Sequence, residues 1–141
     1  MSLRNDIADN IVKTIKELTD PRPVLVTREP FDVEKLAITQ FPAVMVNSGS
    51  EERDDFDMSF RSGTIEYTLR CFVRGAAEID RQKNDLIESI SEGLEEDRRR
   101  GTSNPGVTTL IATVEVIDRL PPLAEVIITV QVRYRYRKGV E

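Results

Sequence analysis

The clearest pattern in the chain is a strict alternation of apolar and polar residues near its end. Every second residue there is apolar or aromatic: Val126, Ile128, Val130, Val132, Tyr134 and Tyr136. The intervening residues are polar or basic toward the end of the run and include Arg133 and Arg135. A period of two predicts a β-strand with one face on a core. We expect water or another protein to meet its long basic face.

Similar patterns predict four more strands. Alternation indicates strands over residues 64–74 and 107–118, and apolar runs indicate short strands over residues 24–28 and 41–46. In the 107–118 strand the alternation places four residues on the core side: Leu110, Ala112, Val114 and Val116.

Two segments carry apolar residues at helical spacing. The first runs from Leu3 to Leu18 and ends before Pro21, and the second covers residues 78–98. A single helical turn is expected over residues 32–36. Because each long helix has one apolar stripe, both must pack on a sheet face.

The order of these elements predicts a single domain over residues 1–141 with a two-layer α+β fold. We expect one mixed, mostly antiparallel sheet with two helices packed on one face. The last two strands form an antiparallel hairpin. The third and fourth strands are joined through the second helix by a link of crossover length, so they could form a parallel pair. The shared core is expected to contain Leu69, Leu86, Ile90, Val114 and Val130.

Residues 47–63 admit two interpretations. The stretch is acidic, with Glu51, Glu52, Asp54 and Asp55, and it interleaves Phe56, Met58 and Phe60. A solvated loop is the simpler interpretation. The alternative is a projecting β-hairpin whose aromatic residues meet a partner, since long loops in small domains are commonly functional.

The composition argues against an enzyme. The chain has no histidine, which excludes Ser-His-Asp triads, Cys-His dyads and histidine metal sites. The one cysteine, Cys71, is expected to be buried and inert. The acidic stretch could bind a hard cation, but it lacks EF-hand spacing. We therefore expect no catalytic residues, no cofactor and no tightly bound metal.

Charge and hydropathy limit the kinds of molecule that this chain is expected to bind. The net charge of −5 argues against tightly held nucleic acid. Arginines 98–100 follow acidic residues at a helix end, which is ordinary helix-end electrostatics. No apolar run reaches the length of a membrane helix, so we expect no membrane partner and a cytosolic site of synthesis. The arginine face is a candidate protein interface, and a charged edge that opposes aggregation is the alternative.

Several segments, taken in order, resemble the tail terminator family of long-tailed bacteriophages, also called tail completion or minor tail protein U-like proteins. They are the N-terminal helix, Phe41-Pro42-Ala43-Val44-Met45-Val46, Phe72-Val73-Arg74-Gly75, the 78–98 helix, Val116-Ile117-Asp118, Pro122-Leu123-Ala124 and the C-terminal strand. The resemblance covers nearly the whole chain. Residues 51–62 and 133–138 follow no pattern of that family.

The resemblance implies an assembly role in the virion. Such proteins form a hexameric ring on the head-proximal end of the tail tube, end tube polymerisation and offer a surface to the head connector. DNA passes through the lumen without specific binding. A head–tail connector or neck protein of similar architecture is the first alternative, and a small enzyme or ligand-binding α+β domain is the second. The expected ring interface combines Arg70, Arg133 and Arg135 with Glu51, Glu52, Asp54, Asp55 and Phe56.

Overall fold

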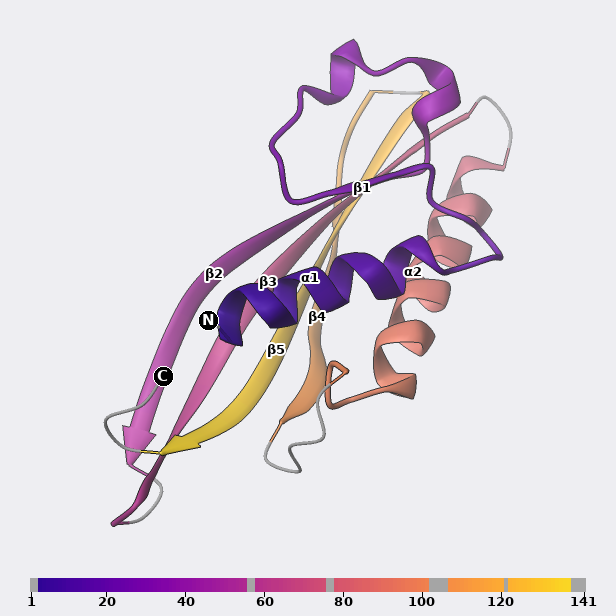
Figure 1. The fold of residues 1–141 in the computed structure, drawn as a ribbon. Coiled ribbons are helices and arrows are strands. Elements are labelled where there is room, and N and C mark those ends of the chain that lie inside the picture. Colours follow the sequence, from indigo (N-terminus) through magenta and orange to yellow (C-terminus); the bar gives the residue numbers. More distant parts are fainter. Residues whose placement is uncertain (1–2, 56–57, 76–77, 102–106, 121, 138–141) are drawn as a thin grey trace.

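The computed structural model describes residues 3–55, 58–75, 78–101, 107–120 and 122–137 (Figure 1). The two α-helices are α1 (Leu3–Lys16) and α2 (Ile79–Glu96), and two short 3-10 helices, η1 (Val33–Lys35) and η2 (Ile38–Gln40), follow the first strand. The strands are β1 (Leu25–Thr27), β2 (Ala43–Asp55), β3 (Phe60–Arg74), β4 (Thr108–Ile117) and β5 (Leu123–Arg137). They form one sheet in the order β1-β2-β3-β5-β4.

Both long helices pack on the same face of this sheet, which we call the helix face. α1 buries Ile7, Ile11 and Ile15, and α2 buries Leu86, Ile90 and Leu94. All six join one apolar cluster with alternate residues of β2, β3 and β5. The predicted α+β fold, with a mixed sheet and two helices on one face, is confirmed. β1 pairs with β2 in parallel, and the other pairs are antiparallel.

The opposite face, which we call the open face, is covered at one end only by the residues that the structure describes. The segment between β1 and β2, which carries η1 and η2, lies over Phe72 and Ala43 and forms a second apolar cluster with them through Val33 and Phe41. Phe31 meets Phe72 edge-to-face, with ring centroids 5.7 Å apart. The expected helical turn at residues 32–36 is η1, and Asp32 caps it by accepting a hydrogen bond from the Glu34 amide.

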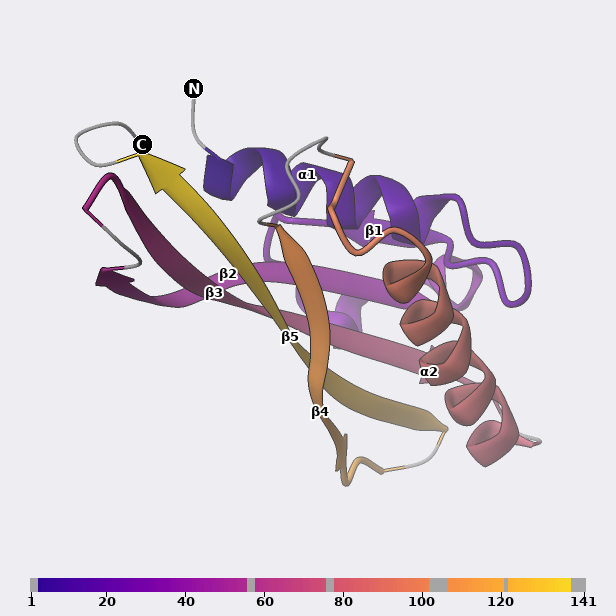
Figure 2. The same ribbon diagram turned by 90° about the horizontal axis from the view of Figure 1, so that it is seen from below.

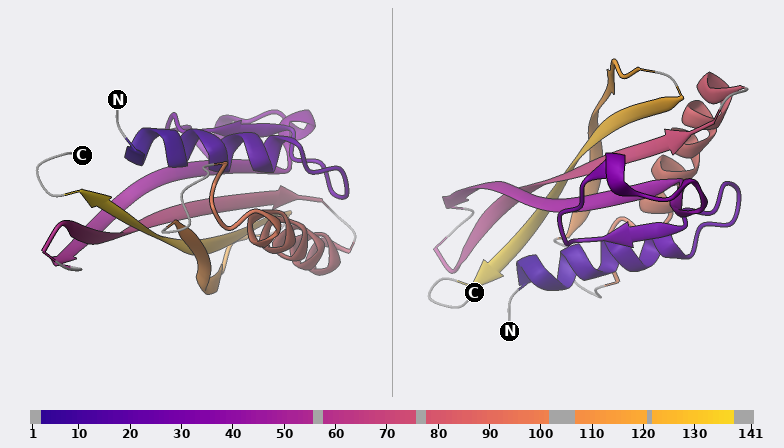
Figure 3. Two further views of the ribbon diagram at one scale, coloured as in Figure 1. Left: turned by 60° about the horizontal axis from the view of Figure 1, so that its bottom comes forward. Right: turned by 90° about the horizontal axis from the view of Figure 1, so that it is seen from above.

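Within the stretch 47–63, residues 47–55 and 60–63 are strand and not loop. β2 runs through to Asp55 and pairs with β3 along almost its whole length, so the predicted hairpin is confirmed; the contact of its aromatic residues with a partner stays a prediction. Together with β5 the hairpin forms a twisted arm that extends away from α2 (Figures 1 and 3). Phe56 lies outside the described residues. Met58 is 94% exposed.

The predicted core position of Val114 is wrong, and so is the single inward face proposed for its strand. Pairing with β5 shifts between Ile111 and Thr113, so Ala112 is an extra residue in a β-bulge. Since a bulge switches the side-chain alternation, Thr109 and Ile111 face the helices before it, and Leu110 faces the open side. Val114 faces the helices after the bulge but lies on the outermost strand and is 44% exposed (Figure 2).

The predicted crossover from β3 through α2 to β4 does join two parallel strands, but these two strands do not pair with each other. β3 and β4 run parallel to one another, yet β5 lies between them and pairs with both in antiparallel fashion. The predicted antiparallel hairpin of the last two strands is confirmed.

Candidate interaction surfaces of the sheet

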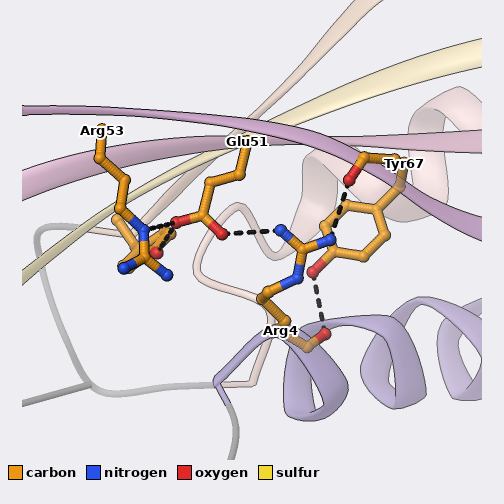
Figure 4. A network of polar contacts seen from close by, with 6 residues as sticks. Arg4, Glu51, Arg53 and Tyr67 are labelled. Atoms are coloured by element: carbon orange, nitrogen blue, oxygen red, sulfur yellow. Dashed lines mark hydrogen bonds and ion pairs between the residues drawn. The ribbon is translucent and has the colours of Figure 1, made fainter.

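Glu51 lies on the helix face and is held by residues from three elements (Figure 4). Its carboxylate accepts a 2.7 Å hydrogen bond from Arg4 Nη1 of α1 and a 2.6 Å bond from Arg53 Nε. The Tyr134 hydroxyl of β5 donates to the same carboxylate. Tyr67 completes the group by donating its hydroxyl to the Arg4 carbonyl oxygen at 2.9 Å. The network fastens the start of α1 to the arm.

The side chain of Glu51 is only 7% exposed, yet it remains charged. Burial raises the pKa of this carboxyl, but hydrogen bonds from Arg53, Tyr134 and Arg4 favour the anion, and the net effect lowers the pKa below its usual value. These internal contacts account for the position of Glu51.

Gly63 lets the Tyr134 ring reach that carboxylate. The two residues face each other across β3 and β5, and a Cβ on Gly63 would lie 2.7 Å from the ring carbons Cε1 and Cζ. An aromatic ring over a strand glycine is a recurrent way of filling the gap that glycine leaves.

We expect Gly63→Ala to destabilise the chain by about 1–3 kcal/mol, because the new methyl group must displace a ring that is held in place. Urea denaturation checks this. Gly75→Ala is the matched control, since its Cβ would meet the movable end of Gln82 at 3.2 Å. Equal stabilities for the two variants would contradict the role given to Tyr134.

Arg70 takes part in a second buried ion cluster, at the covered end of the open face. Its guanidinium lies 3.0 Å from Glu125, whose side chain is 3% exposed, and Arg119 binds the other oxygen at 2.7 Å. Both arginines also lie over the Phe72 ring, with Cζ atoms 5.3 and 5.5 Å from its centroid. Cation–π contact and charge pairing thus fix Arg70 within its own chain.

The uncovered half of the open face carries two columns of opposite charge. We name Glu52 and Asp54 of β2 the acidic column, and Arg133 and Arg135 of β5 the arginine column. Register places Glu52, Thr64 and Arg133 in one row across the sheet. Asp54, Ser62 and Arg135 form the next row.

The two columns are two strands apart, or about 9.5 Å between their Cα traces. Glu52, Asp54 and Arg133 are exposed, and Arg135 is half-buried. Thr64 and Ser62 of β3 separate the columns, so this half of the face carries both signs of charge close together.

The structure places the predicted interface residues in several different environments. Arg133, Arg135, Glu52 and Asp54 lie together on the open face. Asp55 is exposed near the hairpin tip and pairs with Arg61 at 3.4 Å. Nothing in the sequence indicated the roles of Arg4, Arg119 and Glu125. The spacing of single charged residues along a chain does not indicate which distant residues they contact in the fold.

The described residues also include a buried cysteine and line two small hollows. Cys71 is buried, and burial, followed by the nearby Glu125 charge, raises its pKa to about 12, so the thiol is unreactive. Within the described ranges, no three His, Cys, Asp or Glu side chains are grouped as a metal site would require. Two hollows on the open face beside the columns measure about 160 and 260 Å³. None of the described helices has the length and hydropathy to cross a membrane.

Comparison with known proteins gives a relation in fold. No family model and no curated protein matches the chain. Among solved structures, the chain is similar to one from the virion of the native gene transfer agent (GTA) particle, with a TM-score of 0.56 and 10% sequence identity. The similarity covers 96% of this chain and 96% of that one. At this identity the comparison establishes a shared fold.

Proposed function

We propose that this chain is a structural protein of a phage-like virion, and that it caps the head-proximal end of the tail tube as a ring. The observation that carries the virion assignment is the end-to-end fold similarity with a chain of the gene transfer agent virion. The finer assignment, to a tail terminator, is supported by the order of sequence segments that resembles that family.

The surface chemistry supports assembly over catalysis. A ring of identical subunits joined head to tail needs two different, complementary patches on each subunit. The acidic column and the arginine column are of opposite sign and lie on different strands, β2 and β5, so each could face a different neighbour. The hollows beside them are smaller than the ~300–1,000 Å³ typical of small-molecule pockets, which weighs against a ligand-binding domain.

We expect Arg133→Glu with Arg135→Glu to abolish ring formation or tail capping while leaving the monomer folded. Exposed ion pairs contribute only ~0–1 kcal/mol each, but reversal replaces attraction by repulsion from the acidic column. Sedimentation over a concentration series and co-sedimentation with polymerised tail tube measure the effect. Because exposed charges are screened, the assembly of the parent should weaken as salt rises.

The matched control is Arg22→Glu with Lys35→Glu, which makes the same change in net charge at exposed positions away from the columns. If the arginine-column variant caps tail tubes as well as the control does, the open face is not the interface. Binding of the parent to the head connector without binding to the tube would favour the neck-protein alternative.

A further inference from the structure

The outer strand β4 is an open edge with an unusual surface. Residues 112–116 are all exposed, so both faces of the strand are bare there. Three of the large apolar side chains exposed in the described part of the protein belong to this strand: Leu110 at 59%, Val114 at 44% and Val116 at 53%. Of the features that protect edge strands, the β4 sequence TTLIATVEVI has no Lys and no Pro; it has one charge, Glu115, and the bulge at Ala112.

The other edge of the sheet is also open. β1 pairs with only three residues of β2, from Ala43 to Met45, and within the described residues no strand covers β2 from residue 46 to residue 55. One of its carbonyls, that of Gly49, accepts a hydrogen bond from Arg4 at 2.8 Å. In the part of the chain that the structure describes, β4 and the stretch of β2 beyond Met45 are therefore two sheet edges without a neighbouring strand.

We propose that residues 108–114 of β4 in one subunit pair through their main chain with residues 46–52 of β2 in a second copy, so that the sheet continues from subunit to subunit. Beyond Val114 the two strands part, because β1 of the second copy covers Ala43 to Met45. Strand direction favours this occupant. β2 and β4 run in opposite directions within the sheet, so a neighbour placed side by side in the same orientation presents its β2 antiparallel to β4. The contact is head to tail, as a ring requires.

Charge complementarity supports the same occupant. Within one subunit a single row across the sheet begins with Glu52 on β2 and ends with Thr108 on β4. If this row continues into the next subunit, Thr108 lies opposite the Glu52 of that neighbour. Arg133 then lies between two Glu52 side chains, its own across β3 and the neighbour's across β4. Arg133, bordered by an acidic residue on one side in the monomer, becomes bordered on both sides.

The bulges of the two edges also correspond. β2 is bulged between Ser48 and Glu51, and β4 between Ile111 and Thr113. Ser48 and Ile111 belong to one row, through Tyr67 and Val130. The two bulges lie on either side of this row, so each strand has one extra residue over the same stretch and a regular pairing of the two edges is kept across it. A bulge on one edge alone would instead separate the two strands.

A disulfide experiment tests the pairing. Thr108→Cys and Glu52→Cys are prepared as separate, differently tagged proteins, mixed under assembling conditions with the tail tube and oxidised. Directly opposed residues of paired strands meet the Cα separation that a disulfide needs. We expect heterodimers of the two variants and no homodimers. Thr108→Cys mixed with Ile38→Cys is the control, because Ile38 is exposed on the segment between β1 and β2.

The outcomes separate this inference from the proposed function on which it rests. Assembly on the tube without heterodimers overturns the pairing and leaves the capping role intact. Homodimers of Thr108→Cys would show that β4 pairs with β4, and cross-links to another virion protein would show a different occupant; either result overturns the inference. A chain that neither self-associates nor binds the tube contradicts both proposals.

A charge at the edge provides an independent measurement. Val114→Lys places an ammonium group on the helix face of β4, where the proposed neighbour would bury it, while the monomer leaves the site half exposed. We expect the concentration needed for assembly to rise at least about tenfold, a change of ~1.4 kcal/mol. Ile38→Lys is the matched control. Equal assembly of the two variants would count against pairing through β4.

Discussion

Ile90→Ala should lower the free energy of unfolding by about 2–5 kcal/mol. Ile90 is 0% exposed and sits on α2 in the middle of the apolar cluster between the helices and the sheet. Truncation removes buried methyl groups and leaves a cavity, because the surrounding strands are fixed by their ladders and can relax only in part. Urea denaturation monitored by circular dichroism measures the loss.

The matched control lies one turn away on the same helix. Ile87 packs only partly against the cluster, so Ile87→Ala makes the same chemical change at a half-buried site and should cost clearly less. A loss below about 1 kcal/mol for Ile90→Ala would show that α2 is packed in a different register.

Glu51→Gln is expected to destabilise the chain by about 1.5–3 kcal/mol at neutral pH, the range for hydrogen bonds to a charged group. The substitution keeps the shape of the side chain but removes the charge that binds Arg4 and Arg53. Both arginines are about one-third exposed and can return to water, so the cost stays below that of a fully buried orphan charge.

The pH dependence of the stability difference between the parent and Glu51→Gln shows whether the carboxylate charge causes it. The folded-state pKa of Glu51 lies below its unfolded value, so its contribution is complete above the unfolded pKa and is lost as pH falls through the folded pKa. The parent and Glu51→Gln should therefore converge in stability in acid. Glu52→Gln, at the exposed neighbouring position, should match the parent throughout. A gap that persists at low pH would trace the effect to packing.

The main elements of the fold could be predicted from periodicity because their burial is one-sided. The β5 alternation identified Val126, Ile128, Val130 and Val132 as core residues, and all four are buried. The same rule failed on β4. Ala112 is an inserted residue, so the side chains that face the helices are the odd-numbered ones before it and the even-numbered ones after it, and the sequence pattern gives no sign of this change. On an edge strand an apolar side chain can also face the correct side and still have nothing above it.

The polar sites were less predictable for a related reason. Glu51 and Glu52 are adjacent acids in the sequence, yet one is tied beneath α1 and the other faces water. The difference depends on the β2 bulge and on Arg4, 47 positions away. The sequence pattern also grouped Arg70 with Arg133 on one basic face. In the structure, Arg70 pairs with Glu125 and lies over the Phe72 ring of its own chain.

The cover over Phe72 gives the subunit two dissimilar ends. Along the strands, one end is closed by the segment that carries η1 and η2, and the other continues as the bare hairpin arm (Figure 1). Rotation about a single axis cannot exchange the two ends. Any cyclic assembly of this chain whose strands follow the axis would therefore have one rim of compact loops and one rim of projecting hairpins. Such an assembly would be directional, and each of its two rims could accept a different partner.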